Sequence, residues 1–167
     1  MPSLHQGPRG DGERVLLKRS THLWLWLAPA VLLIDQMSKL VLVRSMAPHE
    51  AVNVIPGLFD LVHVRNRGMA FGIFNDAGSG FAPLFLILYT LGVAAVIIFW
   101  IWKSREKDSI TAFALSLILG GAMGNFVDRI RLGEVIDFLD FYVGSYHWPA
   151  FNVADSAITV GTLWVAI

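Results

Sequence analysis

The chain has 167 residues, of which 55% are hydrophobic and only 16% are charged, and its mean hydropathy is +0.59. A soluble domain of this length rarely reaches such values, so the composition favours a membrane protein. Thirteen basic residues balance thirteen acidic ones, which argues against a nucleic-acid binder, and the absence of cysteine excludes disulfides and a cysteine nucleophile. Five scattered histidines, with no pair at a helical ligand spacing, predict no metal site.

The chain opens with a polar segment, which is followed by long apolar ones. Residues 1–20 are rich in Gly, Pro and charge and predict a flexible cytoplasmic arm. A bilayer core of about 30 Å needs about 20 apolar residues in a helix. The remainder, 21–167, predicts one membrane domain with four transmembrane helices at about 23–43, 81–102, 110–128 and 152–167. The second of these contains no charge, whereas the last is short for a full crossing.

Two features set the connections and the direction of the chain. Residues 44–80 are β-branched in part and punctuated by Pro56-Gly57, which predicts a small sheet at the membrane surface between otherwise short exterior loops. Basic residues mark the cytoplasmic segments of membrane proteins. They cluster before the first helix and between the second and third, at Arg9, Arg14, Lys18, Arg19, Lys103, Arg105 and Lys107. Segments 44–80 and 127–151 should then face outward from the inner membrane.

Polar residues within the apolar segments are costly and are therefore candidates for function. Asp35 and Lys39 are an i, i+4 pair on the first helix, which suggests an ion pair, or a carboxylate that caps amides of a neighbouring loop. Asp128 beside Arg129 suggests an internal salt bridge that locks the third helix to a neighbour. Three glycines nearby, Gly120, Gly121 and Gly124, predict a small-residue face for close helix packing.

Two further aspartates, Asp137 and Asp155, have no adjacent cation and stand where the chain enters or leaves an apolar segment. If they meet, mutual repulsion would leave one proton shared between them near neutral pH. One carboxylate could then act as base on a water while the other acts as acid on a carbonyl. Carboxylates of a proton relay in a small transporter fit the same facts, and a scaffold protein is a further alternative. A serine–lysine protease is a weaker one, because Ser38 and Lys39 point about 100° apart on a helix.

Five motifs in order carry a resemblance to a known family: "DQMSK" at Asp35, "NRGMAFG" at Asn66, "GGAMGNFVDR" from Gly120, "GEVIDF" around Asp137 and "FNVADSAITVG" from Phe151. The chain resembles the lipoprotein signal peptidases (signal peptidase II), the aspartic proteases of the bacterial inner membrane. The resemblance implies an all-α membrane protein with four transmembrane helices, both termini in the cytoplasm and a small periplasmic β-cradle. The implied activity removes signal peptides from prolipoproteins, cutting before a cysteine that carries a diacylglyceryl group.

The resemblance also assigns residues and partners. It makes Asp137 and Asp155 the catalytic dyad, with no metal and no cofactor. It places a supporting or substrate-binding shell around them: Asp35, Lys39, Asn66, Gly68, Asn125, Asp128, Arg129, Asn152 and Ala154. The implied partners are prolipoproteins and membrane lipid, without nucleic acid, for a monomeric enzyme. Loop 59–74, with its apolar side chains, is expected either to clamp the substrate or to seat the sheet in the headgroup layer. Arg67 departs from the small or polar residue that is frequent in the family.

Overall fold

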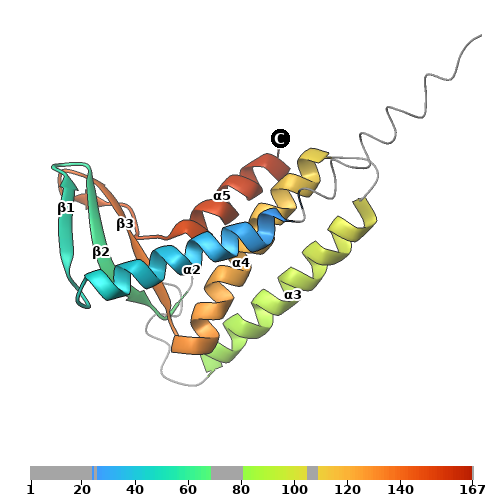
Figure 1. Ribbon diagram of the computed structural model, residues 1–167, viewed down its shortest axis with the longest axis horizontal. Helices are drawn as coiled ribbons and strands as arrows, with labels where there is room; N and C mark the ends of the chain where they lie inside the picture. Colours follow the sequence, from blue (N-terminus) through green and yellow to red (C-terminus); the bar gives the residue numbers. More distant parts are fainter. Residues whose placement is uncertain (1–23, 25, 69–80, 105–108, 167) are drawn as a thin grey trace, which may run out of the picture.

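The computed structural model describes residues 24, 26–68, 81–104 and 109–166. The predicted N-terminal arm lies outside these residues, and so does the part of the predicted clamp from residue 69 onward. Figure 1 shows the helices packed together, with a small sheet beside one end of the bundle and the C-terminus at the opposite end.

The helices occupy the four predicted segments: α2 at Leu27–Ser45, α3 at Phe81–Ser104, α4 at Ser109–Leu132 and α5 at Val153–Val165. In the described part of the chain, two of them, α3 and α4, are long and apolar enough by themselves to cross a membrane. The other two fall short for identifiable reasons. Asp35 and Lys39 lower the apolar character of α2, and α5 has only 13 residues.

The sheet has four antiparallel strands in the order β1-β2-β3-β4. Strands β1 (Ala51–Ile55) and β2 (Phe59–Asn66) lie in the segment where the sequence predicts a sheet. Strands β3 (Val135–Val143) and β4 (Tyr146–His147) come from the connection between α4 and α5, where no strand is predicted. The sheet therefore joins the connection between α2 and α3 to the connection between α4 and α5, and β3 carries Asp137 into it.

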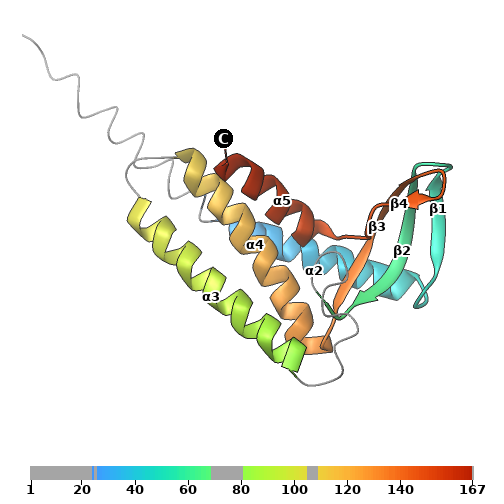
Figure 2. The same ribbon diagram turned by 180° about the vertical axis from the view of Figure 1, so that it is seen from behind.

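The sheet is fixed to the bundle through an apolar cluster. Leu42 and Met46 at the end of α2 pack on Ile136 and Phe138 of β3. Figure 2 shows β3 running from the C-terminal end of α4 and the connection after it leading back to the start of α5. Helix α4 contacts the other three helices and β3, and the start of α5 lies against Gly121 and Gly124 of α4. The start of α5, the second half of α4 and β3 are therefore neighbours.

Glycines allow α4 to approach its neighbours closely, as the small-residue face predicts. A Cβ at Gly120 would lie 2.7 Å from the carbonyl oxygen of Ala28 on α2. A Cβ at Gly121 would overlap the backbone of Ala154 on α5, and one at Gly124 would meet the Asp35 carboxylate. The absence of these side chains brings α2 and α5 against α4, so the polar residues on all three helices come within contact.

The variant Gly121→Ala should lower the free energy of unfolding by about 1–3 kcal/mol, because its methyl group meets backbone atoms of α5 that have little room to yield. Gly92→Ala is the matched control, since a Cβ at Gly92 on α3 meets no atom within 4 Å. Thermal unfolding in detergent should show a lower midpoint for the first variant and an unchanged or higher one for the second. Equal midpoints would contradict the close α4–α5 contact.

Candidate active site

Asp137 lies on β3 and is almost fully buried, with 2% of its surface exposed. Both carboxylate oxygens accept hydrogen bonds from side-chain amides: Oδ2 from Asn66 Nδ2 at 3.0 Å, and Oδ1 from Asn152 Nδ2 at 2.7 Å. Asn66 is placed by the antiparallel register, which sets Val64 opposite Asp137. The side chains of alternate residues share a face of a strand, so Asn66 reaches the same side as Asp137.

Asp155 lies in the first turn of α5 and is held by two asparagines. Its Oδ1 accepts a hydrogen bond from Asn125 Nδ2 at 2.7 Å, and its Oδ2 lies 3.4 Å from the backbone nitrogen of Asn152. Its own backbone N–H donates to Asn152 Oδ1 at 2.9 Å. The last two contacts form a capping box, which fixes the start of the helix and the carboxylate together.

Asn152 brings the two aspartates together. It is completely buried, and its Nδ2 contacts Asp137 while its backbone nitrogen contacts Asp155. The same Nδ2 lies 3.2 Å from Asn125 Oδ1. One residue therefore spans the two carboxyl groups that the sequence could only suggest as a pair.

The surroundings of Asp137 favour its protonated form. Its pKa is raised from 3.8 to about 7, first because burial penalises the charged carboxylate and second because of the negative charge of Asp155. Hydrogen bonds from Asn66 and Asn152 and the charge of Lys39 oppose the increase but do not cancel it. Near neutral pH this carboxyl group is poised between its two protonation states.

A buried ion cluster stands behind the two aspartates. Lys39 Nζ lies 2.8 Å from Asp35 Oδ2 and 2.7 Å from Asp128 Oδ2, and all three side chains are at least 97% buried. The predicted Asp35–Lys39 pair is therefore present. Asp35 also accepts a hydrogen bond from the backbone nitrogen of Ala154 at 2.9 Å, which ties α2 to the start of α5.

The prediction of a salt bridge between Asp128 and Arg129 is wrong, because Asp128 pairs with Lys39 instead. Adjacent residues on a helix point about 100° apart, so Asp128 turns to Lys39 on α2 and Arg129 turns elsewhere. Arg129 instead donates to the carbonyl oxygen of Gly68 at 3.1 Å, and the Gly68 backbone nitrogen donates to Asn66 Oδ1 at 2.9 Å. Arg129 thus holds the end of the segment that positions Asn66.

Lys39 also determines the orientation of Asn125. Its ammonium donates to Asn125 Oδ1 at 3.1 Å, and an ammonium group can only donate. The amide nitrogen of Asn125 must then face the other way, toward Asp155. Sequence reasoning did not assign this role to Lys39, and it did not single out Gln36, whose amide donates to Asp128 Oδ1 at 2.9 Å. A polar side chain inside an apolar helix was the available signal for Gln36.

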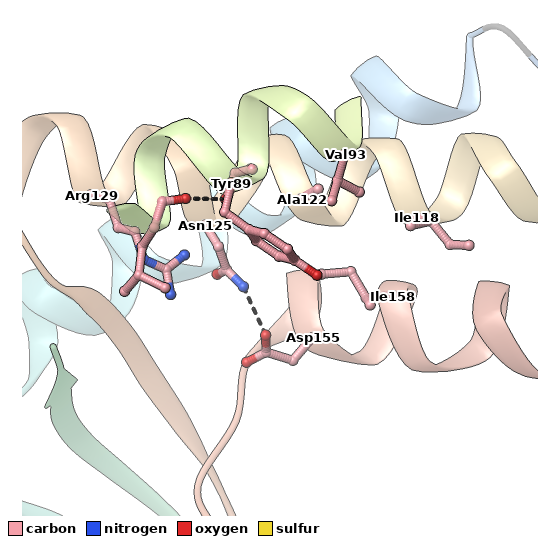
Figure 3. Close-up of a pocket in the computed structure, with 10 residues that line it drawn as sticks. Tyr89, Val93, Ile118, Ala122, Asn125, Arg129, Asp155 and Ile158 are labelled. Carbon is pink, nitrogen blue, oxygen red and sulfur yellow. Dashed lines mark hydrogen bonds between the residues drawn. The ribbon is translucent and has the colours of Figure 1, made fainter. Parts of the chain in front are cut away.

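A cavity of about 300 Å³ opens beside Asp155, between α3, α4 and α5 (Figure 3). Asn125, Arg129 and Asp155 line its polar end. The remaining lining is mainly apolar and is supplied by Leu86, Tyr89, Thr90, Val93, Ile118, Ala122 and Ile158. The cavity is therefore suited to a ligand with a polar group at the aspartates and hydrocarbon along the helices.

Asp137 and Asp155 share one buried asparagine, and Asp155 lies at the polar end of an apolar cavity between helices, an arrangement typical of aspartic proteases that work in a membrane. Residues 27–167 match the family model of signal peptidase (SPase) II. The chain therefore belongs to the signal peptidase II family, and this membership decides against the transporter and scaffold alternatives.

Relatives and solved structures agree with this assignment. The lipoprotein signal peptidase of Syntrophus aciditrophicus (strain SB) is 46% identical over 151 residues, which is 90% of this chain and 94% of the relative. The lipoprotein signal peptidase of Cupriavidus taiwanensis is 50% identical over 145 residues, 87% of this chain and 81% of the relative. Two solved structures of bacterial membrane enzymes are each 31% identical, with TM-scores of 0.77 and 0.76. The alignments cover 86% and 87% of this chain and 85% and 90% of theirs.

Proposed function

We propose that this enzyme removes signal peptides from prolipoproteins that carry a diacylglyceryl-modified cysteine, cutting just before that cysteine. The observation that supports this proposal is the shared contact of Asp137 and Asp155 with Asn152, together with the apolar cavity whose polar end Asp155 lines. Acyl chains bound between the helices would hold the adjacent peptide bond near the two carboxyl groups. The cysteine itself need not enter the helical bundle, because only its acyl chains occupy the apolar part of the cavity.

In the proposed reaction Asp137 holds a proton and Asp155 is ionised. Asp155 accepts a proton from a water molecule, whose oxygen attacks the carbonyl carbon of the scissile bond, while Asp137 donates its proton to the carbonyl oxygen. In the second step the C–N bond breaks as Asp155 donates its proton to the leaving nitrogen, and the carbonyl re-forms as Asp137 takes back a proton from the hydroxyl group of the tetrahedral intermediate. Asn66, Asn125 and Asn152 keep the two carboxyl groups in place throughout.

The proposed topology places the aspartates at the periplasmic side of the inner membrane and both termini in the cytoplasm. Lys103 stands in the last turn of α3, at the end of the bundle away from the sheet. Basic residues favour the cytoplasmic side, so the sheet and the aspartates would lie at the opposite surface. A lipidated precursor anchored in the outer leaflet would present its cleavage site at this depth.

A diacylglyceryl-modified peptide should be cleaved with a kcat/KM at least about 100-fold above that of its unlipidated twin. Each buried methylene contributes about 0.8 kcal/mol, so four of them already correspond to this factor. Ala122→Phe fills the apolar part of the cavity from α4 and should reduce cleavage of the lipidated peptide. Equal cleavage of the two peptides by the wild-type protein would refute lipid-directed processing.

A further inference from the structure

A pair of arginines at the end of β2 is braced by a single carboxylate. Glu134, just before β3, lies 2.7 Å from Arg65 Nη1 and 3.3 Å from Arg67 Nε. The register explains the arrangement, since Asn66 pairs with Val135 and the residues on either side of Asn66 flank the start of β3. The Glu134 side chain is 10% exposed, whereas those of Arg65 and Arg67 are 41% and 75% exposed.

Within the described residues, the arginine pair formed by Arg65 and Arg67 has Glu134 as its single acidic partner and so carries one excess positive charge. Burial alone would raise the pKa of Glu134, but the hydrogen bonds and charges of the two arginines outweigh burial and lower it. Glu134 is therefore ionised, and one carboxylate faces two guanidinium groups. Each guanidinium has five N–H donors, and within the described residues one nitrogen of each is engaged by Glu134. With side chains that are 41% and 75% exposed, the two guanidinium groups keep further donors accessible to a ligand.

The arginine pair points away from the two aspartates. Asn66 directs its amide to Asp137, and successive side chains of a strand alternate between its faces. Arg65 therefore lies on the other side of the strand from Asp137, and Arg67, just after the strand, contacts the same carboxylate of Glu134 as Arg65. A peptide bound at the aspartates is not the natural partner of this surface.

Exposed apolar residues lie at the end of α4, close before Glu134 in the chain. Ile130 and Leu132 in the last turn of α4 are 58% and 43% exposed, and Leu132 stands two residues before Glu134. Guanidinium groups next to exposed aliphatic side chains at the end of an apolar helix match the boundary between headgroups and hydrocarbon. A planar guanidinium pairs with two phosphate oxygens at once, so two of them suit a phosphodiester.

We propose that Arg65 and Arg67, braced by Glu134, form a binding site for the phosphate headgroup of an anionic phospholipid. The acyl chains of this lipid lie along the exposed apolar residues at the end of α4, outside the bundle and apart from the cavity beside Asp155. The site anchors the end of β2 that carries Asn66, so an anionic lipid steadies one of the hydrogen-bond donors to Asp137.

The test measures thermal stabilisation of the purified full chain in neutral detergent by dioctanoyl phosphatidylglycerol and by dioctanoyl phosphatidylcholine. The wild-type protein should bind the anionic lipid about fivefold more tightly at low salt, as expected for one unpaired charge at a membrane surface, and lose the preference in 1 M salt. Arg67→Gln should abolish the preference while Arg65 keeps Glu134 paired, and Arg67→Lys should retain much of it. Lys103→Gln, at the opposite end of the bundle, is the control and should behave as wild type.

Several outcomes would overturn the site. Equal binding of the two lipids, or an unchanged preference in Arg67→Gln, removes the lipid assignment. Equal stabilisation by inorganic phosphate would make the pair a free-anion site. If Arg67→Gln leaves lipid binding unchanged and alters only the cleavage of peptides with acidic residues beside the cleavage site, the arginine pair binds the substrate peptide and not a lipid. None of the lipid measurements uses cleavage, so they are independent of the proposed activity.

Discussion

Asp137→Asn and Asp155→Asn should each lower kcat for a lipidated peptide by about 10³-fold or more, while the protein still folds. An asparagine keeps the volume of the side chain and can bond its neighbouring amides, but it neither takes a proton from water nor gives one to a carbonyl oxygen. General acid and base steps contribute about 10²–10⁴-fold each, and the loss of either should also misplace the attacking water. Single-turnover cleavage of the purified variants measures the effect.

Asp140→Asn is the matched control for this experiment. Asp140 lies three residues further along β3 and pairs with His147 at 2.8 Å, away from Asn152. Its replacement should leave kcat within about twofold, because it changes the charge of the sheet without touching the dyad. Near-normal cleavage by either dyad variant would remove the assignment of Asp137 and Asp155.

The pH dependence supplies a second readout for Asp137. Its pKa of about 7 means that the carboxyl group is protonated below this pH, so cleavage by the wild-type protein should fall as pH rises through 7.

The stability of the protein should also fall as the pH rises. The folded protein keeps the proton on Asp137 up to about pH 7, whereas the unfolded chain releases it near pH 3.8. The stabilisation from this proton is therefore fully present below pH 3.8 and is lost as the pH rises to about 7. Asp137→Asn should therefore melt above wild type at pH 8 and not at pH 4.

Apolar length and motif order were sufficient to predict the four helical segments and the residues around the site, but not the strand that carries Asp137. The segment "VIDFLDFYV" reads as a nearly continuous apolar run, because the side chains on both faces of β3 are buried over its first half. A half-buried strand would alternate and be recognisable, whereas one buried on both faces does not. Its pairing with β2 joins residues about 70 positions apart, which no local pattern reveals.

The partner of Asp128 illustrates a second limit. Neighbouring opposite charges suggest a local pair, but the packing of α2 against α4 decides which cation is available. Gly120 and Gly124 let α2 approach so closely that Lys39 enters between Asp35 and Asp128. The sequence contained the glycines and the charges, but only the geometry of contact between helices connects them.

Lys39→Met should destabilise the protein by about 3–5 kcal/mol, the range found when one partner of a buried ion pair is removed. Lys39 is the one ammonium group within 3 Å of both the Asp35 and Asp128 carboxylates in the described part of the chain, and both acids are at least 97% buried. Without it, two carboxylates would face each other in a low-dielectric interior. Thermal or denaturant unfolding in detergent measures the loss, with Lys103→Met as the control because Lys103 is exposed in the last turn of α3.

A double variant separates lost charge compensation from lost packing. Asp128→Asn in the Lys39→Met background removes one uncompensated carboxylate, so it should recover part of the stability, although Asp128→Asn alone is expected to destabilise. The activity of this double variant should stay low, since Asn125 no longer has the donor that turns its amide toward Asp155. Additive losses in the double variant would instead mean that Lys39 acts through packing, and wild-type activity in a stable double variant would remove its link to Asn125.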